Sequence, residues 1–322
     1  SENGRLIVRD NAAGIFRSEY TRAFKPAEIP PDRSGLSEFG MGMKSAACWF
    51  SKNWSVRTSA LGENFEGFVY FDLESIIEGN IENLDITFRQ VANDSHYTEI
   101  VMTNLHIVLQ GRTISKIKDH LASIYRVFTR EGILKLTFNG EELVYEEPRI
   151  LNAPFYNDPS GESVLWRKDI SFDFGLGLSV HGFAALRETA STSKAGFALF
   201  RKNRLILGSG DDTYRPEYIF GHSNSYRYQR LFGELHLEGF EVSHTKDGFK
   251  WDDNEEVFLE ILKEHLNSQP LPLLVQAEEH RVRPSRGALI QGAEQATDRT
   301  AQAIRDNVPP VLESQIIRPP EF

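Results

Sequence analysis

Cysteine is nearly absent from this sequence, because Cys48 is the only one among 322 residues. A single thiol excludes an internal disulfide and a zinc site built from several thiolates. Long apolar runs are also missing, and none approaches the roughly 20 residues that a membrane-spanning helix needs. No basic and then apolar signal peptide opens the chain. These absences predict a cytoplasmic protein that has no membrane partner. The histidines of the sequence also show no pairing at the spacing of metal ligands.

Basic residues are in the minority, with 36 Lys and Arg against 46 Asp and Glu and a net charge of −10. This balance argues against a whole surface built to hold nucleic acid, although a local basic groove would not change the sum. The 40% of hydrophobic residues excludes a mainly disordered protein. The length of the chain favours two domains with sizeable cores.

Hydrophobic periodicity predicts the order of the elements. In the first part we expect a buried strand at 5–9, a mobile polar loop at 15–36, a helix at 45–50, strands at 54–59, 65–72, 86–91 and 98–105, a helix at 113–128 and a hairpin at 134–145. In the second part we expect one strand at 170–186, a hairpin at 196–207, a strand at 231–242 and a helix at 257–266. Trp49 and Phe50 are expected in the core. Pro and Asn residues near 151–160 place the domain boundary there, which gives domains at 1–150 and 151–267 and a C-terminal helical segment and tail at 268–322.

Two glycine-bearing segments indicate a binding site. The string DNAAG at 10–14 ends the first strand, and the string GMG at 40–42 enters a helix. Glycines before a helix let backbone N–H groups approach a phosphate, and Lys44 in the first turn can reach the same anion. Asp10 can accept a hydrogen bond from an exocyclic amine such as that of adenine. The spacing fits neither the dinucleotide-binding fingerprint nor the phosphate loop of P-loop proteins, so plain structural turns are the alternative.

Taken together, residues 5–14 and the string SEFGMGMKSA at 37–46 resemble the Bergerat-fold (GHKL) ATPases, which include gyrase, chaperone, mismatch-repair and histidine-kinase domains. In that family a strand ends in Asp-x-Gly-x-Gly, a flexible ATP lid follows, and Gly-x-x-Gly-x-Gly opens a helix. Asp10 and Gly14 match the first motif, and Ala12 replaces its middle glycine. Gly40 and Gly42 match the second motif.

Two further positions complete or depart from that pattern. Ser37 stands where the second motif has its first glycine. Thr98 resembles the threonine that joins the aspartate in the adenine pocket, although Tyr97 replaces the glycine that usually precedes it.

Within the family the sequence is most similar to MORC-type ATPases. The strings FGMGMKS at 39–45, TEIVMTNL at 98–105 and GFALFRKNRLI at 196–206 resemble their motifs. The string SHTKDGF at 243–249 resembles the loop of the second, transducer domain whose lysine contacts the γ-phosphate. The resemblance therefore implies that Lys246 has this role across the domain interface.

The resemblance implies an α/β fold: a Bergerat sandwich of helices on a mixed sheet, then a smaller transducer-like domain of ribosomal-protein type and C-terminal helices. It implies ATP and Mg²⁺ as cofactors, a lid at about 15–36, and ATP-driven formation of a homodimer that closes as a clamp, with DNA as a possible partner. The residues implied in ATP binding are Asp10, Ala12, Gly14, Ser37, Phe39, Gly40, Met41, Gly42, Met43, Lys44 and Thr98.

One motif of the family has no counterpart in the sequence. The first helix of the family carries a glutamate that activates water and an asparagine that helps to hold Mg²⁺, and it precedes the strand that ends in Asp10. Only nine residues stand there, so we expect that the sequence lacks an upstream segment, and no metal ligand is assigned. Three hypotheses follow: an ATPase clamp, a non-hydrolysing nucleotide-gated switch, and a chaperone-like ATPase that acts on protein.

Overall fold

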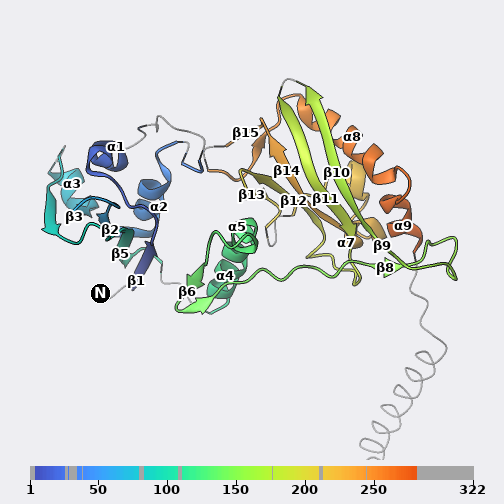
Figure 1. The fold of residues 1–322 in the computed structure, drawn as a ribbon, viewed down its shortest axis with the longest axis horizontal. Helices are drawn as coiled ribbons and strands as arrows, with labels where there is room; N and C mark the ends of the chain where they lie inside the picture. The colour runs from blue at the N-terminus through green and yellow to red at the C-terminus, as the bar shows by residue number, and fades with distance from the viewer. Residues whose placement is uncertain are drawn as a thin grey trace, which may run out of the picture. The chain divides into compact units, whose positions relative to one another are not determined.

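The computed structural model describes residues 4–25, 28, 35–37, 39–79, 83–107, 111–175, 177–209, 213–243 and 245–280. Ser1–Ala153 and Glu162–Glu278 form one compact unit, and Pro154–Gly161 with Glu279–Phe322 form another. The first unit contains two five-stranded sheets (Figure 1). In the second unit, residues 154–161 make a turn in which the Gly161 amide donates to the Asp158 carbonyl at 3.0 Å. The predicted tail beyond residue 280 lies outside the described residues.

The first sheet has the strand order β1-β5-β2-β3-β4, and all neighbouring strands are antiparallel, which corrects the mixed sheet predicted for this domain. Directly opposed residues share a face, so the registers define an inner face that carries the apolar side chains. A core cluster that includes Trp54, Val56 and Met102 lies on that face, and α2 contributes Ala47 to it. The elements of this part are β1 (Arg5–Asp10), η1 (Arg17–Glu19), α1 (Tyr20–Phe24), α2 (Gly42–Phe50), β2 (Ser51–Ser59), β3 (Phe65–Asp72), α3 (Leu73–Glu78), β4 (Ile86–Gln90) and β5 (Tyr97–Leu105).

The first strand is not buried, which corrects the prediction for residues 5–9. Among the described strands β1 lies at the edge of the sheet and pairs with β5 alone, and most of its residues are exposed, including Ile7 at 46% and Val8 at 50%. The end of α2 gives a second correction. Trp49 and Phe50 were expected in the core, but Trp49 is 80% exposed and Phe50 is 39% exposed. An apolar composition predicts burial only where another element covers the residue, and pattern alone does not supply that cover.

The predicted lid is more ordered at its beginning than a polar mobile loop. Residues 17–24 form η1 and α1, and Tyr20 is only 4% exposed. The Tyr20 ring stacks on Phe88 of β4 at 6.2 Å, and Phe24 lies 6.1 Å from Phe71 of β3. The two aromatic residues are four positions apart, so one face of a short helix brings both onto the sheet.

The segment after the first sheet packs against the second sheet. The predicted helix at 113–128 is divided at Tyr125 into α4 (Arg112–Ile124) and α5 (Arg126–Arg130). Val127 of α5 joins a core cluster with Phe200 and Leu205, which belong to the second sheet. The predicted hairpin turns on Asn139 and Gly140, both at positive φ. Its strands are β6 (Thr137–Phe138) and β7 (Glu141–Glu142).

The second sheet has the order β10-β11-β14-β12-β13, and β12 and β14 are parallel. Phe258 of α8 is fully buried, and α8 and α9 lie along one face of this sheet (Figure 1). This part contains β8 (Asn152–Ala153), β9 (Val164–Leu165), β10 (Arg167–Gly175), β11 (Leu178–Leu186), β12 (Gly196–Arg201), β13 (Arg204–Leu207), α6 (Glu217–Phe220), α7 (Tyr226–Arg230), β14 (Leu231–Glu238), β15 (Glu241–Val242), β16 (Phe249–Lys250), α8 (Asn254–Asn267) and α9 (Leu273–Glu279).

Two predicted strands of this part are wrong in extent. The single strand at 170–186 is a hairpin of β10 and β11, whose glycines Gly175 and Gly177 have positive φ values. The strand at 231–242 is interrupted at Gly239, which has a φ of +81°. The mixed α/β fold with two sheets confirms the predicted class, and no described helix has the length and apolar character to cross a membrane.

Candidate nucleotide-binding site

Asp10 and Thr98 lie directly opposite each other on β1 and β5, and Thr58 of β2 lies opposite Thr98 on its other side. These three residues form one row across the inner face, and opposed Cβ atoms in such a row are about 4.5–5.5 Å apart. Asp10 is exposed at the edge of the row, Thr98 is half-buried, and Thr58 is 1% exposed. The structure thus brings together the two residues that the sequence analysis assigned to an adenine pocket.

The hydroxyl of Thr58 is the most connected polar group of this row. Its oxygen lies 3.2 Å from Thr98 Oγ1 and accepts a hydrogen bond from the Ile15 amide at 2.9 Å. The Thr58 hydroxyl donates to the main-chain oxygen of Tyr97 at 3.0 Å. The sequence analysis missed Thr58, because a threonine inside a strand carries no motif. Its position opposite Thr98 depends on the strand register.

Asp10 also organises the turn that follows β1. Its Oδ1 accepts a hydrogen bond from the Ala12 amide at 3.0 Å, which is the local turn that aspartate commonly makes. The Ala12 carbonyl lies 3.0 Å from Nδ1 of His96, in the loop before β5. The turn-capping role that was the alternative for Asp10 is therefore present. It occupies one carboxylate oxygen.

Gly14 is required where it stands. Its φ is +77°, and a Cβ at this position would overlap the main-chain oxygen of Ser59. Only glycine permits both the left-handed conformation and this close approach. The next residue, Ile15, donates to Thr58, so Gly14 and Thr58 together hold the beginning of the predicted lid against β2.

The second glycine segment leads into α2 on the same face of the sheet. Gly40 has a φ of +63°, and a Cβ there would overlap the main-chain oxygen of Glu28. Met41 is the N-cap residue and supplies no side-chain cap, and a Cβ at Gly42 would meet no atom of the described residues within 4 Å. A helix that begins without a side-chain cap leaves amide donors that can accept an anion.

Other predicted residues of this segment have separate places. Met43 packs against the inner-face core, whereas Ser37 is exposed and Phe39 is half-buried. Nζ of Lys44 donates to the main-chain oxygens of Ala23 at 3.0 Å and Lys25 at 2.6 Å, at the end of α1. Burial and the nearby charge of Arg22 lower the pKa of Lys44. In this structure the ammonium therefore holds α1.

Lys246 lies in the loop between β15 and β16, with a φ of +58°. Its ammonium donates to the main-chain oxygen of Leu36 and lies 6.0 Å from the ring centre of Phe39. Ser243 and Asp247 stabilise the loop through a hydrogen bond of 2.6 Å between their side chains. Lys246 thus meets the chain segment that leads into Gly40.

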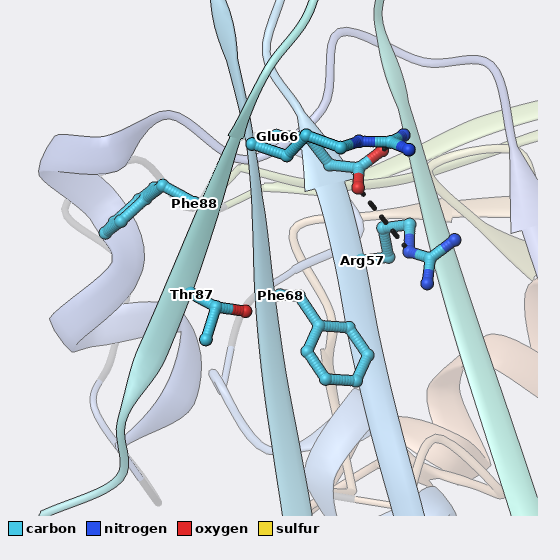
Figure 2. A pocket seen from close by; sticks show the side chains of 6 residues that line it. Arg57, Glu66, Phe68, Thr87 and Phe88 are labelled. Carbon is cyan, nitrogen blue, oxygen red and sulfur yellow. Dashed lines mark hydrogen bonds and ion pairs between the residues drawn. The ribbon is translucent and has the colours of Figure 1, made fainter.

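A separate pocket lies on the outer face of the first sheet, and Figure 2 shows Arg57, Glu66, Phe68 and Thr87 around it. Its volume is about 240 Å³. Glu66 is 4% exposed, and its carboxylate is 3.0 Å from Nη2 of Arg89 and accepts from the Tyr97 hydroxyl. Because side chains alternate along β5, Tyr97 lies on the same face as Glu66, to which its hydroxyl donates, and Thr98 faces the opposite side. The pocket is therefore not part of the Asp10 site.

Comparisons with known proteins agree with this geometry for the first part of the chain. Residues 1–98 match the family described as "Histidine kinase-, DNA gyrase B-, and HSP90-like ATPase". No curated protein sequence matches the chain at a significant level.

Two solved structures are similar to the chain. The B-subunit of the DNA gyrase from Myxococcus xanthus shares 11% identity, with a TM-score of 0.46 and 84% of each chain covered. The ATPase region of Saccharomyces cerevisiae topoisomerase II shares 12% identity, with a TM-score of 0.45 and coverage of 86% of this chain and 78% of that chain. Residues 1–98 are thus similar to the GHKL ATPases, and within this part Asp10 at the end of β1 lies opposite Thr98 of β5, with Gly14 in the turn that follows β1.

Proposed function

We propose that this chain binds Mg-ATP on the inner face of its first sheet. The observation that carries the proposal is the opposition of Asp10 and Thr98 on adjacent strands, on the face that α2 also covers. The second oxygen of the Asp10 carboxylate is suited to the exocyclic amine of adenine. Ala12 and Gly14 form the turn below the base, where a small side chain and a glycine permit close approach.

The phosphates would lie at the beginning of α2. The uncapped amides after Met41 supply hydrogen-bond donors, and the helix dipole adds partial positive charge. Ser37, Phe39 and Gly40 would shape the approach to this site. Lys44 would exchange its contacts with the end of α1 for the phosphates, and Lys246 would approach the γ-phosphate from its loop.

Mg²⁺ would neutralise charge on the phosphates when bound. The described residues contain no group of three or more His, Cys, Asp or Glu side chains that could hold a metal ion. We therefore assign no protein ligand to Mg²⁺ and no residue that activates water. Lys246 lies on the second part of the chain, so its contact with the triphosphate would transmit the nucleotide state to the second sheet.

The output that we propose is ATP-dependent formation of a homodimer that closes as a clamp, as in MORC-like ATPases, with DNA as a candidate partner. The contact of Lys246 with the segment before Gly40 supports this proposal, because it links the second part of the chain to the nucleotide site. A switch that binds ATP without hydrolysing it is the second candidate.

Calorimetric titration with Mg-ATP tests the binding site. Asp10→Asn removes the charged acceptor and should weaken binding by about 10- to 100-fold, since a hydrogen bond to a charged group is worth roughly 1.5–3 kcal/mol. Asp94→Asn removes the same charge from an exposed loop and should bind like the wild type. Equal affinity of all three proteins would refute the adenine role of Asp10.

Phosphate release and sedimentation velocity with and without Mg-ATP then test the output. Phosphate release that Lys246→Ala abolishes supports the ATPase clamp, whereas ATP-dependent dimers without phosphate release support the switch. A monomer in both conditions would contradict the proposed dimerisation. Retention of DNA at low salt, where electrostatic binding is strongest, tests the DNA partner.

A further inference from the structure

We propose that Thr58 is a positioning residue that determines the base specificity of this site. It holds the hydroxyl proton of Thr98, so that Asp10 and Thr98 present only hydrogen-bond acceptors to a ligand. Such a pair accepts a purine with an exocyclic amine, such as adenine, and discriminates against a purine that carries a 6-oxo group in place of the amine. This inference rests on the proposed function and names the substrate class of the same site.

The assignment of protons follows from the partners of Thr58. A threonine hydroxyl has one proton and two lone pairs. The Ile15 amide, at 2.9 Å, can only donate, and the Tyr97 carbonyl, at 3.0 Å, can only accept. The single proton of Thr58 therefore goes to Tyr97, and one lone pair receives the Ile15 N–H.

The remaining lone pair of Thr58 faces Thr98 Oγ1 at 3.2 Å. Because Thr58 has no second proton, Thr98 must be the donor in this contact. The proton of Thr98 is then committed, and its oxygen keeps lone pairs for a ligand. Beside it, the Asp10 carboxylate is acceptor-only when ionised.

Burial makes this arrangement durable. Thr58 is 1% exposed, so water has little access to replace a lost partner. Leaving the half-buried Ile15 amide or Tyr97 carbonyl without the Thr58 hydroxyl would cost the loss of a hydrogen bond. The hydroxyl of Thr58 therefore keeps one orientation. The orientation of the Thr98 hydroxyl is fixed with it.

The ligand chemistry follows directly. An exocyclic amine offers two N–H donors, and the row Asp10–Thr98 offers acceptors on two adjacent strands. A 6-oxo group offers only lone pairs, which would face the lone pairs of the pocket. Sites that hydrogen-bond one group reject an analogue that cannot supply it, because their polar atoms are left unpaired.

Calorimetric titration with Mg-ATP and with Mg-inosine triphosphate measures how strongly the site prefers the exocyclic amine over a 6-oxo group. The base of inosine triphosphate carries the 6-oxo group where adenine carries the amine. The wild type should prefer ATP by at least about tenfold, which corresponds to one hydrogen bond. Thr58→Val keeps the shape but frees the Thr98 hydroxyl to rotate and donate, so the ratio of the two affinities should fall by about three- to tenfold relative to the wild type, to the preference that the Asp10 carboxylate alone supplies. Thr58→Ser keeps the hydroxyl and should keep the wild-type ratio.

The ratio separates this role from a merely structural one, because a general loss of structure weakens both nucleotides alike. A wild type that binds both nucleotides equally, or a Thr58→Val protein that keeps the wild-type ratio, would overturn the inference while the ATP site stands. If the wild type binds neither nucleotide, the proposed function fails and this inference fails with it.

Hydrogen exchange without nucleotide tests the contact network independently, even if Thr58→Val folds poorly. In the wild type and in Thr58→Ser the Ile15 amide should be protected, since it donates to the residue 58 hydroxyl. Exchange of this amide as fast as that of an unstructured residue in the folded wild type would remove the basis for the proton assignment.

Discussion

Nζ of Lys44 lies 2.6 Å from the main-chain oxygen of Lys25, so a lysine in the first turn of α2 holds the carboxyl end of α1. Lys44 is only 9% exposed, and the oxygens of Arg22 and Ala23 are also within hydrogen-bonding distance. The last carbonyls of a helix have no partner inside it, and a cation is favourable there. The beginning of the predicted lid is therefore attached to the helix that follows it.

Lys44→Met should release this end of α1. The carbonyls of Ala23 and Lys25 lose a donor, which we expect to lower the free energy of unfolding by about 1–3 kcal/mol. Hydrogen exchange should accelerate at the Lys25 amide, which donates to Thr21 at 2.9 Å. The control is Lys52→Met, which removes an exposed lysine bound to Glu74 and should leave both measurements unchanged. Unaltered exchange in Lys44→Met would show that the ammonium does not hold α1.

Glu234 should be essential for the attachment of α5 to the second sheet. Its Oε1 accepts from Nε of Arg126 at 2.6 Å, and both side chains are buried. Arg130 adds two hydrogen bonds of 3.0 Å. Glu234→Gln leaves Arg126 buried without its carboxylate, and we expect a loss of about 3–5 kcal/mol in urea unfolding.

Glu147 provides the matched control for this substitution. It also binds Arg130, at 2.8 Å, but its side chain is 53% exposed. Glu147→Gln should therefore change the stability by no more than about 0.5 kcal/mol. Similar losses for Glu147→Gln and Glu234→Gln would contradict the importance of burial.

The same carboxylate predicts a pH dependence. Burial by itself raises the pKa of Glu234, but the hydrogen bonds from Arg130 and the charge of Arg126 outweigh it and hold the pKa below its ordinary value. A lowered folded-state pKa gives stability that is present above the unfolded pKa and is lost as the pH falls through the folded one. Acid unfolding of the wild type should show this loss, and the Glu234→Gln profile should be flatter over the same range.

Gly14→Ala should disrupt the turn by overlap as well as by backbone strain. The added Cβ would meet the main-chain oxygen of Ser59, so we expect a protein that is unfolded or strongly destabilised. Gly62→Ala separates the two effects, because Gly62 has a φ of +89° and no atom of the described part of the chain lies within 4 Å of the added carbon. It should cost only about 1 kcal/mol. Equal melting temperatures for the two variants would refute the close approach at Gly14.

The pKa of Tyr97 predicts that the free energy of unfolding falls at alkaline pH. Burial, the hydrogen bond to Glu66 and the charge of Glu66 raise the pKa of Tyr97 to about 12. The unfolded state loses this proton at about pH 10, so the contribution to stability is present below that pH and is lost as the pH rises toward 12. Tyr97→Phe should make alkaline unfolding less steep over this interval, and Tyr70→Phe, at an exposed position, should not. An unchanged Tyr97→Phe profile would contradict the shift.

Local signals in the sequence predicted much of the fold. The strand at 65–72 and the hairpins through Asn139 and through Lys202 follow from side-chain alternation and turn residues, which act within a few positions. The wrong predictions concern burial, which depends on the elements packed around a residue. Residues 5–9 form an exposed edge strand, and Trp49 is exposed, because burial depends on elements distant in the chain.

The features of the site also divide into those that the local sequence predicts and those that depend on the tertiary structure. The sequence by itself determined the glycine turns at Gly14 and Gly40 and the presence of an aspartate at the end of a strand, since these depend on local backbone conformation. Only the tertiary structure decided that Thr58 touches Thr98, that Lys44 holds the end of α1, and that Glu234 receives Arg126 across 108 positions. The physical reason is that hydrogen bonds and burial act over a few ångströms in space. The strand register and the helix packing determine which groups become hydrogen-bond partners, and no single segment of the sequence encodes them.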